Sequence, residues 1–161
     1  MPSPLRYNAR ADQNEARLGS ARQRGKVSRG EFLKGYLLDT GIALVAMDQP
    51  EHLRGPLRTA IERGPGVLSV VSFWEVIIKS QKKTLDVGDP RAWWDEALYA
   101  LALKPLLLRP AHIAEIYQLP LHHSDPFDRA LIAQAISEEL TLLTADTEIP
   151  RYASHRFRVL R

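Results

Sequence analysis

The chain is organised around residues Tyr36-Leu37-Leu38-Asp39-Thr40, where a short apolar run ends in a carboxylate. An apolar-rich segment, residues 41–46 (GIALVA), follows directly. This pattern predicts a buried strand of a parallel sheet that leads straight into a helix. In open α/β sheets, ligands bind beyond the carboxyl ends of the strands, and Asp39 is expected at such an end.

Later segments supply further carboxylates at similar positions. Glu75 follows the apolar segment 67–71, Asp125 and Asp128 begin a helical pattern, and Asp146 follows another predicted strand. Clustered acids repel one another, so burying them together is costly unless a cation compensates. Oxygen ligands without cysteine or paired histidine select Mg²⁺ or Mn²⁺. The pattern therefore predicts a divalent metal site.

Each of these carboxylates also has a purely structural explanation. Asp39 and Asp125 could cap the helices that follow them. Glu75 could complete a capping box with Ser72, in which its side chain reaches back to the Ser72 amide. Asp146 could stabilise a turn. The recurrence of an acid at four separate junctions, rather than any single acid, favours the metal site.

The histidines do not extend this site in the sequence. His122 and His123 are interpreted as loop residues rather than ligands, and the other three, His52, His112 and His155, show no pairing. A zinc site needs three or four nitrogen or sulfur ligands, so none is expected.

Size and composition are those of one globular domain. The chain has 161 residues, of which 45% are hydrophobic and 25% charged, and it contains no cysteine. Without cysteine there is no disulfide framework and no thiolate chemistry, which is compatible with a reducing, cytoplasmic location. No apolar run reaches the roughly 18 residues that span a bilayer, so no membrane association is expected.

Residues 1–34 are predicted to form a basic, disordered N-terminal extension, and residues 35–161 the folded domain. Residues 1–35 hold eight Lys and Arg against three acids, whereas the whole chain has a formal charge of only +3. Few large apolar residues occur there, so ordering this segment would bury little surface. The extension could contact phosphates through its charge, or it could have no function.

The folded part alternates predicted strands and helices. Strands are expected over residues 36–38, 67–71, 105–108, 141–144 and 156–160. Helices are expected over residues 41–47, 50–63, 72–83, 90–101, 110–116 and 125–140. This alternation predicts an α/β fold with a central, mostly parallel sheet of four to five strands, flanked by helices in three α/β/α layers.

Four short motifs occur in order within residues 36–161. They are Leu38-Asp39-Thr40, Ser72-Phe73-Trp74-Glu75 with Lys79, the run 123–135 (HSDPFDRALIAQA), and Leu143-Thr144-Ala145-Asp146. Together they resemble the motifs of PIN-domain proteins. The similarity is greatest to the VapC-like ribonuclease toxins of bacterial type II toxin–antitoxin pairs.

This resemblance implies a PIN-like fold with an acidic pocket that binds one or two Mg²⁺ or Mn²⁺ ions. By match of motif, the catalytic and metal-binding positions are taken by Asp39, Glu75, Asp128 and Asp146. Asp125 belongs to the third motif, where it could ligate directly, ligate through water, or cap the helix. Thr144 matches a hydroxyl position close to the metals.

The resemblance also implies an activity and partners. The expected reaction is metal-dependent endonucleolytic hydrolysis of RNA, in which one ion activates water and a second steadies the leaving oxygen. Such proteins are usually homodimers, repressed by a cognate antitoxin protein that blocks the pocket. Lys79 and Arg129 are candidates for holding RNA at the rim.

Two other functions fit parts of the same pattern. One is a non-catalytic PIN-fold module that binds RNA or a protein partner, although no acidic position is lost. The other is a Mg²⁺-dependent phosphatase for small molecules. A phosphatase with a phospho-aspartyl intermediate would want a D-x-D motif, whereas Asp39-Thr40-Gly41 lacks the second acid.

The aromatic residues Trp74, Trp93, Trp94 and Tyr99 are interpreted mainly as core. Trp93 and Trp94 are adjacent, so they are not expected to share one helix face. One of them is therefore predicted to be exposed, where it could contact a second copy or the antitoxin.

Overall fold

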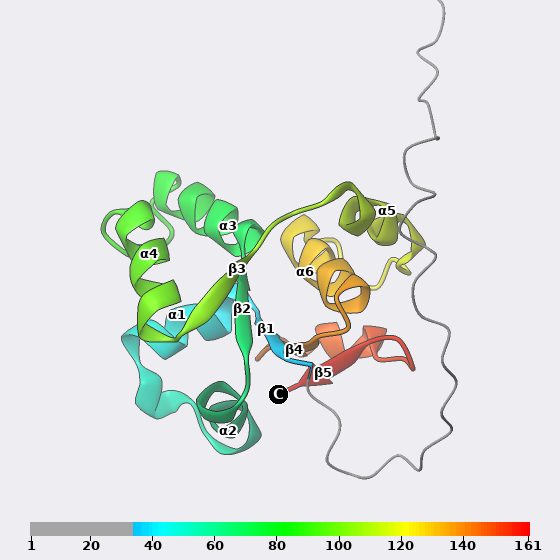
Figure 1. Cartoon of the computed structure of the whole chain (residues 1–161). Helices are drawn as coiled ribbons and strands as arrows, with labels where there is room; N and C mark the ends of the chain where they lie inside the picture. Colours follow the sequence, from blue (N-terminus) through cyan, green and yellow to red (C-terminus); the bar gives the residue numbers. More distant parts are fainter. Residues whose placement is uncertain (1–33) are drawn as a thin grey trace, which may run out of the picture. The chain divides into compact units, whose positions relative to one another are not determined.

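The computed structural model describes residues 34–161, which are built around a five-stranded sheet in which every strand pair is parallel (Figure 1). The strand order is β3-β2-β1-β4-β5. The strands are β1 (Tyr36–Leu38), β2 (Gly66–Ser69), β3 (Leu103–Leu106), β4 (Thr141–Leu143) and β5 (Arg158–Leu160). This confirms the predicted α/β fold with a central parallel sheet.

Helices cover both faces of the sheet. They are α1 (Thr40–Asp48), α2 (Gly55–Arg63), α3 (Val70–Gln81), α4 (Pro90–Ala100), α5 (Pro110–Gln118) and α6 (Pro126–Ser137), with short 3₁₀ turns η1 (Pro50–His52) and η2 (Ile149–Tyr152). Successive strand residues point to opposite faces, so Leu38 packs with α1–α4 and Leu37 packs with α6 and η2. Figure 1 shows α1, α3 and α4 on one side of β1 and α6 on the other, and each side has its own hydrophobic core.

Strand β2 ends earlier than the sequence pattern predicts. The predicted strand 67–71 stops at Ser69, and α3 already begins at Val70. The Ser69 hydroxyl accepts the Val71 amide hydrogen at 3.0 Å and thereby caps the helix. Val70 and Val71 could continue the strand or begin the helix, and the Ser69 cap favours the helix.

This shift removes the predicted capping box. Ser72 and Glu75 lie inside α3, and Glu75 is in its second turn rather than at the third helical position. Its carboxylate therefore does not cap α3, and its contacts are described below with the site.

Two other boundaries differ from the prediction. The predicted helix 50–63 is divided into η1 and α2, because Gly55 has a left-handed φ of +57° and Pro56 disfavours a helical residue before it. Strand β3 lies two residues earlier than the predicted strand 105–108.

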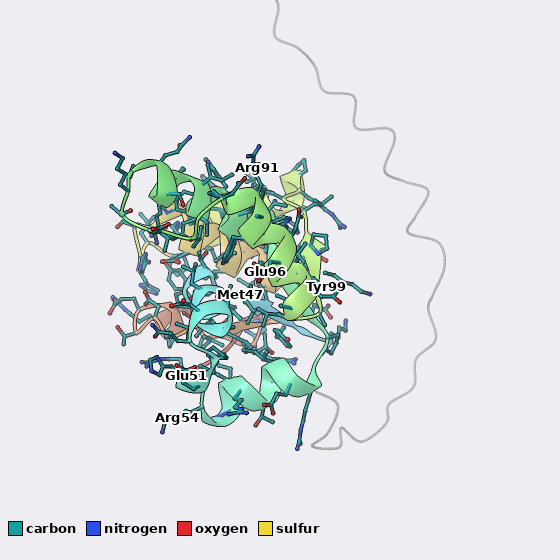
Figure 2. All side chains as sticks on the ribbon, turned by 90° about the vertical axis from the view of Figure 1, so that its left-hand side faces the viewer. Met47, Glu51, Arg54, Arg91, Glu96 and Tyr99 are labelled. Carbon is teal, nitrogen blue, oxygen red and sulfur yellow. The ribbon has the colours of Figure 1, made fainter. Side chains whose placement is uncertain are left out.

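The prediction that Trp93 or Trp94 is exposed is wrong. Both are buried, because α4 packs against α1 as well as α3, and Trp94 stacks on Phe73 with ring centroids 4.9 Å apart. The exposed aromatics of this group are Trp74, at 55%, and Tyr99, at 90%. Figure 2 shows Tyr99 on α4, on the same side of the molecule as Met47 and Glu96.

Within the part that the structure describes, no helix has the length and apolarity needed to cross a membrane. The predicted basic extension, residues 1–34, falls outside the described residues apart from Lys34, which forms an ion pair with Glu139. The disorder of that extension stays a prediction.

The substitution Gly66→Ala is expected to destabilise the sheet. A methyl group at this position would run into the buried Tyr36 ring and the Leu103 side chain, which belong to the neighbouring strands. We expect the free energy of unfolding, measured by chemical denaturation, to fall by about 1–3 kcal/mol. Leu107→Ala, at an exposed position after β3, should change it by less than about 0.5 kcal/mol. Equal stabilities of the two variants would contradict this packing.

Candidate metal centre

The candidate site begins where β1 and β4 end side by side. Leu38 and Leu143 are register partners in this parallel pair, so the residues that follow them emerge together. The Asp39 amide donates to the Leu143 carbonyl oxygen at 3.0 Å. The Thr144 hydroxyl donates to Oδ2 of Asp39. Two motifs that are far apart in the sequence therefore meet at one edge of the sheet.

Asp39 uses its two carboxylate oxygens differently. Oδ1 accepts the amide hydrogens of Gly41 and Ile42 and so caps α1, whereas Oδ2 receives the Thr144 hydroxyl. The side chain is buried, and burial raises the pKa of Asp39 above its usual value. The negative charge of Glu75 raises this pKa further, while the three hydrogen bonds oppose the increase.

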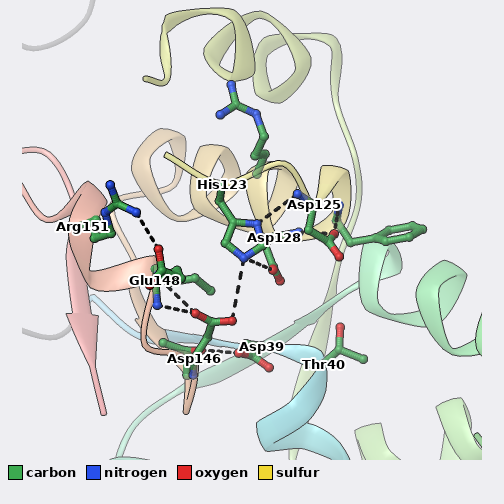
Figure 3. Close-up of polar contacts among 12 residues, drawn as sticks. Asp39, Thr40, His123, Asp125, Asp128, Asp146, Glu148 and Arg151 are labelled. Atoms are coloured by element: carbon green, nitrogen blue, oxygen red, sulfur yellow. Dashed lines mark hydrogen bonds and ion pairs between the residues drawn. The ribbon is translucent and has the colours of Figure 1, made fainter. Parts of the chain in front are cut away.

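Asp146 is held in a similar way. Its Oδ1 accepts the amide hydrogens of Glu148 and Ile149, and its own amide donates to the Thr144 hydroxyl at 3.0 Å. Thr144 is fully buried and links Asp39 with Asp146. Oδ2 of Asp146 remains directed toward His123 (Figure 3).

Glu75 joins the site through the residue after Asp39. Its Oε2 accepts the Thr40 hydroxyl at 2.5 Å, and its Oε1 forms a 2.6 Å ion pair with the Lys79 ammonium. The Thr40 hydroxyl also lies 3.0 Å from the Ser72 hydroxyl oxygen. The buried Glu75 carboxylate is thus fixed by α1 and by its own helix.

Asp125 and Asp128 approach the site from the start of α6. Oδ1 of Asp125 caps this helix by accepting the amide hydrogens of Phe127 and Asp128 at 2.8 and 3.3 Å. Burial raises the pKa of Asp128 to about 7, and the charges of Asp125, Asp39 and Glu75 add to the increase. The pKa of Asp128 is thus raised by acids from the starts of α1 and α6 and from α3.

His123 lies between two of the acids, which the sequence reasoning missed. Its Nε2 is 3.4 Å from Oδ2 of Asp128 and 3.9 Å from Oδ2 of Asp146 (Figure 3). The predicted loop placement is correct, since His123 precedes the cap residue Asp125. Its position two residues before Asp125, within the third motif, is the signal that could have identified it.

The hydrogen bonding of His123 sets the tautomer of its neutral ring. Its Nδ1 accepts the Asp125 amide hydrogen at 3.0 Å, so the neutral ring carries its proton on Nε2. His123, Asp128 and Asp146 offer atoms within 4.8 Å of one another, a spacing compatible with metal binding. A protonated Nε2 does not ligate a metal, so the imidazole is better suited to orienting the two carboxylates.

The two basic residues predicted at the rim have different surroundings. The Lys79 side chain is 47% exposed, and its hydrogen bond to Glu75 raises its pKa, with smaller increases from the charges of Asp125 and Asp128. Arg129 is buried. Its guanidinium donates to the carbonyl oxygens of Ile116, Leu119 and Pro120 and to the Tyr152 hydroxyl. Arg129 therefore stabilises the loop before α6 and is not positioned to hold RNA.

The raised pKa of Asp128 predicts a pH-dependent stability of the metal-free protein. The folded carboxyl keeps its proton up to about pH 7, whereas the unfolded one loses it near the ordinary pKa of 3.8. Between these values the folded state binds more protons, so this group lowers the stability as pH rises. Asp128→Asn should therefore raise the free energy of unfolding by about 1–2 kcal/mol at pH 8 and by much less near pH 4.5.

Urea denaturation at several pH values in a chelator measures this difference. Asp95→Asn, at an exposed position on α4, is the matched control and should show no such trend. A stabilisation of Asp128→Asn that stays constant from pH 4.5 to 8 would contradict the crowding of acids around Asp128.

The sequence profile of the PIN domain matches residues 36–154 of this chain. No curated protein sequence matches the chain at a significant level.

Solved structures with a similar fold include VapBC2 from Rickettsia felis bound to a DNA fragment from their promoter. Its identity is 16% and its TM-score 0.59, over 78% of this chain and 96% of the other. DNA-bound VapBC from Salmonella typhimurium has 17% identity and a TM-score of 0.56, over 78% and 96%. VapBC-5 from Mycobacterium tuberculosis, of the VapBC family of toxin–antitoxin systems, has 18% identity and a TM-score of 0.53, over 79% and 98%.

The structural likeness shows a common fold at low identity, and the profile match spans most of the described residues. This chain belongs to the PIN-domain family.

Proposed function

We propose that this protein is a divalent-metal-dependent endoribonuclease and the toxin of a type II toxin–antitoxin pair. The observation that carries the proposal is the convergence of Asp39, Glu75, Asp128 and Asp146 from four separate segments. Such a group of acids is costly to bury without a compensating cation, as the pKa of Asp128 near 7 indicates.

The donor set fits Mg²⁺ or Mn²⁺. Asp39, Asp146, Asp128 and Glu75 offer hard carboxylate oxygens, with Asp125 as a further candidate, and the chain has no cysteine. When bound, such ions provide Lewis acidity for phosphodiester hydrolysis, which lowers the pKa of water and neutralises developing negative charge.

The other residues of the site orient these carboxylates. Thr144 donates to Asp39 and accepts from the Asp146 amide, while Nε2 of His123 faces Asp128 and Asp146. Lys79 holds Glu75 and adds positive charge at the exposed rim. An RNA phosphate approaching an acidic pocket needs such a charge, because carboxylates alone repel it.

The proposed partners are a cognate antitoxin, which would block this pocket, and a second copy of the chain. The likeness to solved VapBC structures supports an antitoxin partner. RNA is the proposed substrate on the strength of the PIN-domain match and the metal-binding chemistry.

Asp39→Asn is expected to abolish RNA cleavage while the fold remains intact. The asparagine side-chain oxygen can still cap α1, but the negative charge toward the site is lost. Incubating total RNA with Mg²⁺, Mn²⁺ or EDTA measures the activity. We expect metal-dependent fragments from the parent protein and a rate at least about 100-fold lower for the variant.

Asp95→Asn, on the exposed surface of α4, should cleave as the parent does. Circular dichroism shows whether each variant is folded. Metal-dependent cleavage by folded Asp39→Asn at the parent rate would overturn the site assignment.

His123→Ala is expected to weaken metal binding without abolishing it. Loss of a group that orients ligands typically lowers metal affinity about 10- to 100-fold. Calorimetric titration with Mn²⁺ measures the affinity, and His122→Ala is the neighbouring control, since His122 contacts Tyr152 rather than the acids. Unchanged affinity for His123→Ala would remove His123 from the site, and complete loss would make it a ligand.

A further inference from the structure

Trp74 is an exposed aromatic residue at the edge of the candidate metal centre. It directly precedes Glu75 on α3, and 55% of its surface is accessible. Its position suggests a core residue in the sequence, but unlike the buried Trp93 and Trp94 it belongs to neither hydrophobic core. The indole therefore offers an accessible aromatic surface next to the buried Glu75.

A second aromatic residue holds the indole. The rings of Trp74 and Phe127 meet edge to face, with centroids 5.1 Å apart and an angle of 81° between the planes. Phe127 lies between the two acids Asp125 and Asp128 in the first turn of α6, and Figure 3 shows these acids at the site. Trp74 is therefore anchored at the place where the acid-bearing segments of α3 and α6 come together.

Positive charge is available on the same helix. Lys79 lies one turn beyond Glu75, and its ammonium forms a 2.6 Å ion pair with Oε1 of Glu75. The Lys79 side chain is 47% exposed, so its charge is accessible at the rim of the site. The helix α3 thus carries an anchored indole and a lysine beside Glu75. An acidic pocket alone would offer no surface on which a nucleobase could stack.

This combination suits single-stranded nucleic acid. Proteins bind single strands by stacking bases on aromatic side chains and by attracting the backbone with basic residues. A protein-binding role for Trp74 is the alternative, but a single exposed indole next to the proposed nuclease site matches a nucleotide better than an extended apolar interface.

We propose that Trp74 stacks on a base of single-stranded RNA next to the phosphodiester that is cut, and so positions the strand across the metal centre. The inference rests on the proposed ribonuclease function. Trp74 is a positioning and specificity residue in this role, because it contacts the substrate base and not the reacting phosphate.

Intrinsic fluorescence provides the first test. Trp93 and Trp94 are buried, so quenching by a stacked base reports mainly on Trp74. Twelve-nucleotide oligoadenylate and oligouridylate are titrated into Asp39→Asn protein, which is chosen to prevent cleavage, in Mg²⁺. We expect saturable quenching, and its loss when Trp74→Phe is added to this background.

Affinity provides the second test. In the same background, Trp74→Leu should weaken binding of these oligonucleotides about 5- to 100-fold, the range for loss of one base–aromatic stack, and Trp74→Phe should weaken it less. Tyr99→Leu is the matched control, because Tyr99 is an even more exposed aromatic on α4. It should leave the affinity unchanged.

A substrate series locates the stacked base. Single abasic substitutions are placed along an RNA that the parent protein cleaves. At one position the abasic substitution should weaken binding to the Asp39→Asn protein. The same substitution should have no effect when Trp74→Leu is also present, since the two changes remove the same contact. In the protein with Asp39 intact, Trp74→Leu should raise KM while kcat changes little, as expected for loss of ground-state binding.

The outcomes separate this inference from the proposed function. Cleavage by Trp74→Leu with parental KM, together with unchanged oligonucleotide affinity, would overturn the role of Trp74 and leave the nuclease in place. Saturable quenching without cleavage by the parent would support stacking but contradict the ribonuclease. A smaller oligomer for Trp74→Leu in analytical ultracentrifugation, with unchanged RNA affinity, would assign Trp74 to a protein interface instead. Absence of oligonucleotide binding alongside metal-dependent cleavage by the parent would overturn stacking by Trp74 and leave the nuclease in place, whereas absence of both binding and cleavage would overturn both.

Discussion

The parallel pairing of β1 with β4 is the constraint on which the rest of the site depends. Leu38 and Leu143 are register partners, so Asp39 and Thr144 emerge side by side although they are 105 positions apart in the sequence. The Thr144 hydroxyl also accepts a hydrogen bond from the Asp146 amide and so links Asp146 to Asp39. A register shifted by one residue would turn these side chains to opposite faces of the sheet and separate them.

Helix capping and a metal role are compatible uses of the same carboxylates. In Asp39, Asp125 and Asp146, Oδ1 accepts backbone amide hydrogens. Oδ2 of Asp39 and of Asp146 faces other side chains of the site. The backbone thus fixes the direction of each carboxylate. Asp128 makes no such cap. Burial and the neighbouring acids raise its pKa to about 7, so its charged form is the one that crowding disfavours.

Local patterns were sufficient for most of the fold and insufficient for several contacts. Short apolar runs that alternate with helical patterns predicted the parallel sheet, because a strand buried on both faces needs a continuous apolar run. The predicted start of α3 was wrong because Ser69, rather than Ser72, caps this helix. Which serine acts as the cap depends on the residue at which β2 ends. Arg129 was predicted at the RNA rim from its charge, yet it is a buried residue of α6 whose guanidinium donates to four acceptors. His123 was missed because a loop residue has no periodicity to reveal its direction.

The α/β class, the parallel sheet and the acids at the ends of its elements could be predicted from the sequence, because apolar periodicity and helix-start chemistry are local properties. Which of these side chains meet could be seen only in the folded chain. Strand register brings Asp39 to Thr144, the packing of α3 on α6 brings Trp74 to Phe127, and the loop before α6 directs His123 toward the acids. These contacts join residues far apart in the chain, and their geometry follows from packing rather than from any local pattern.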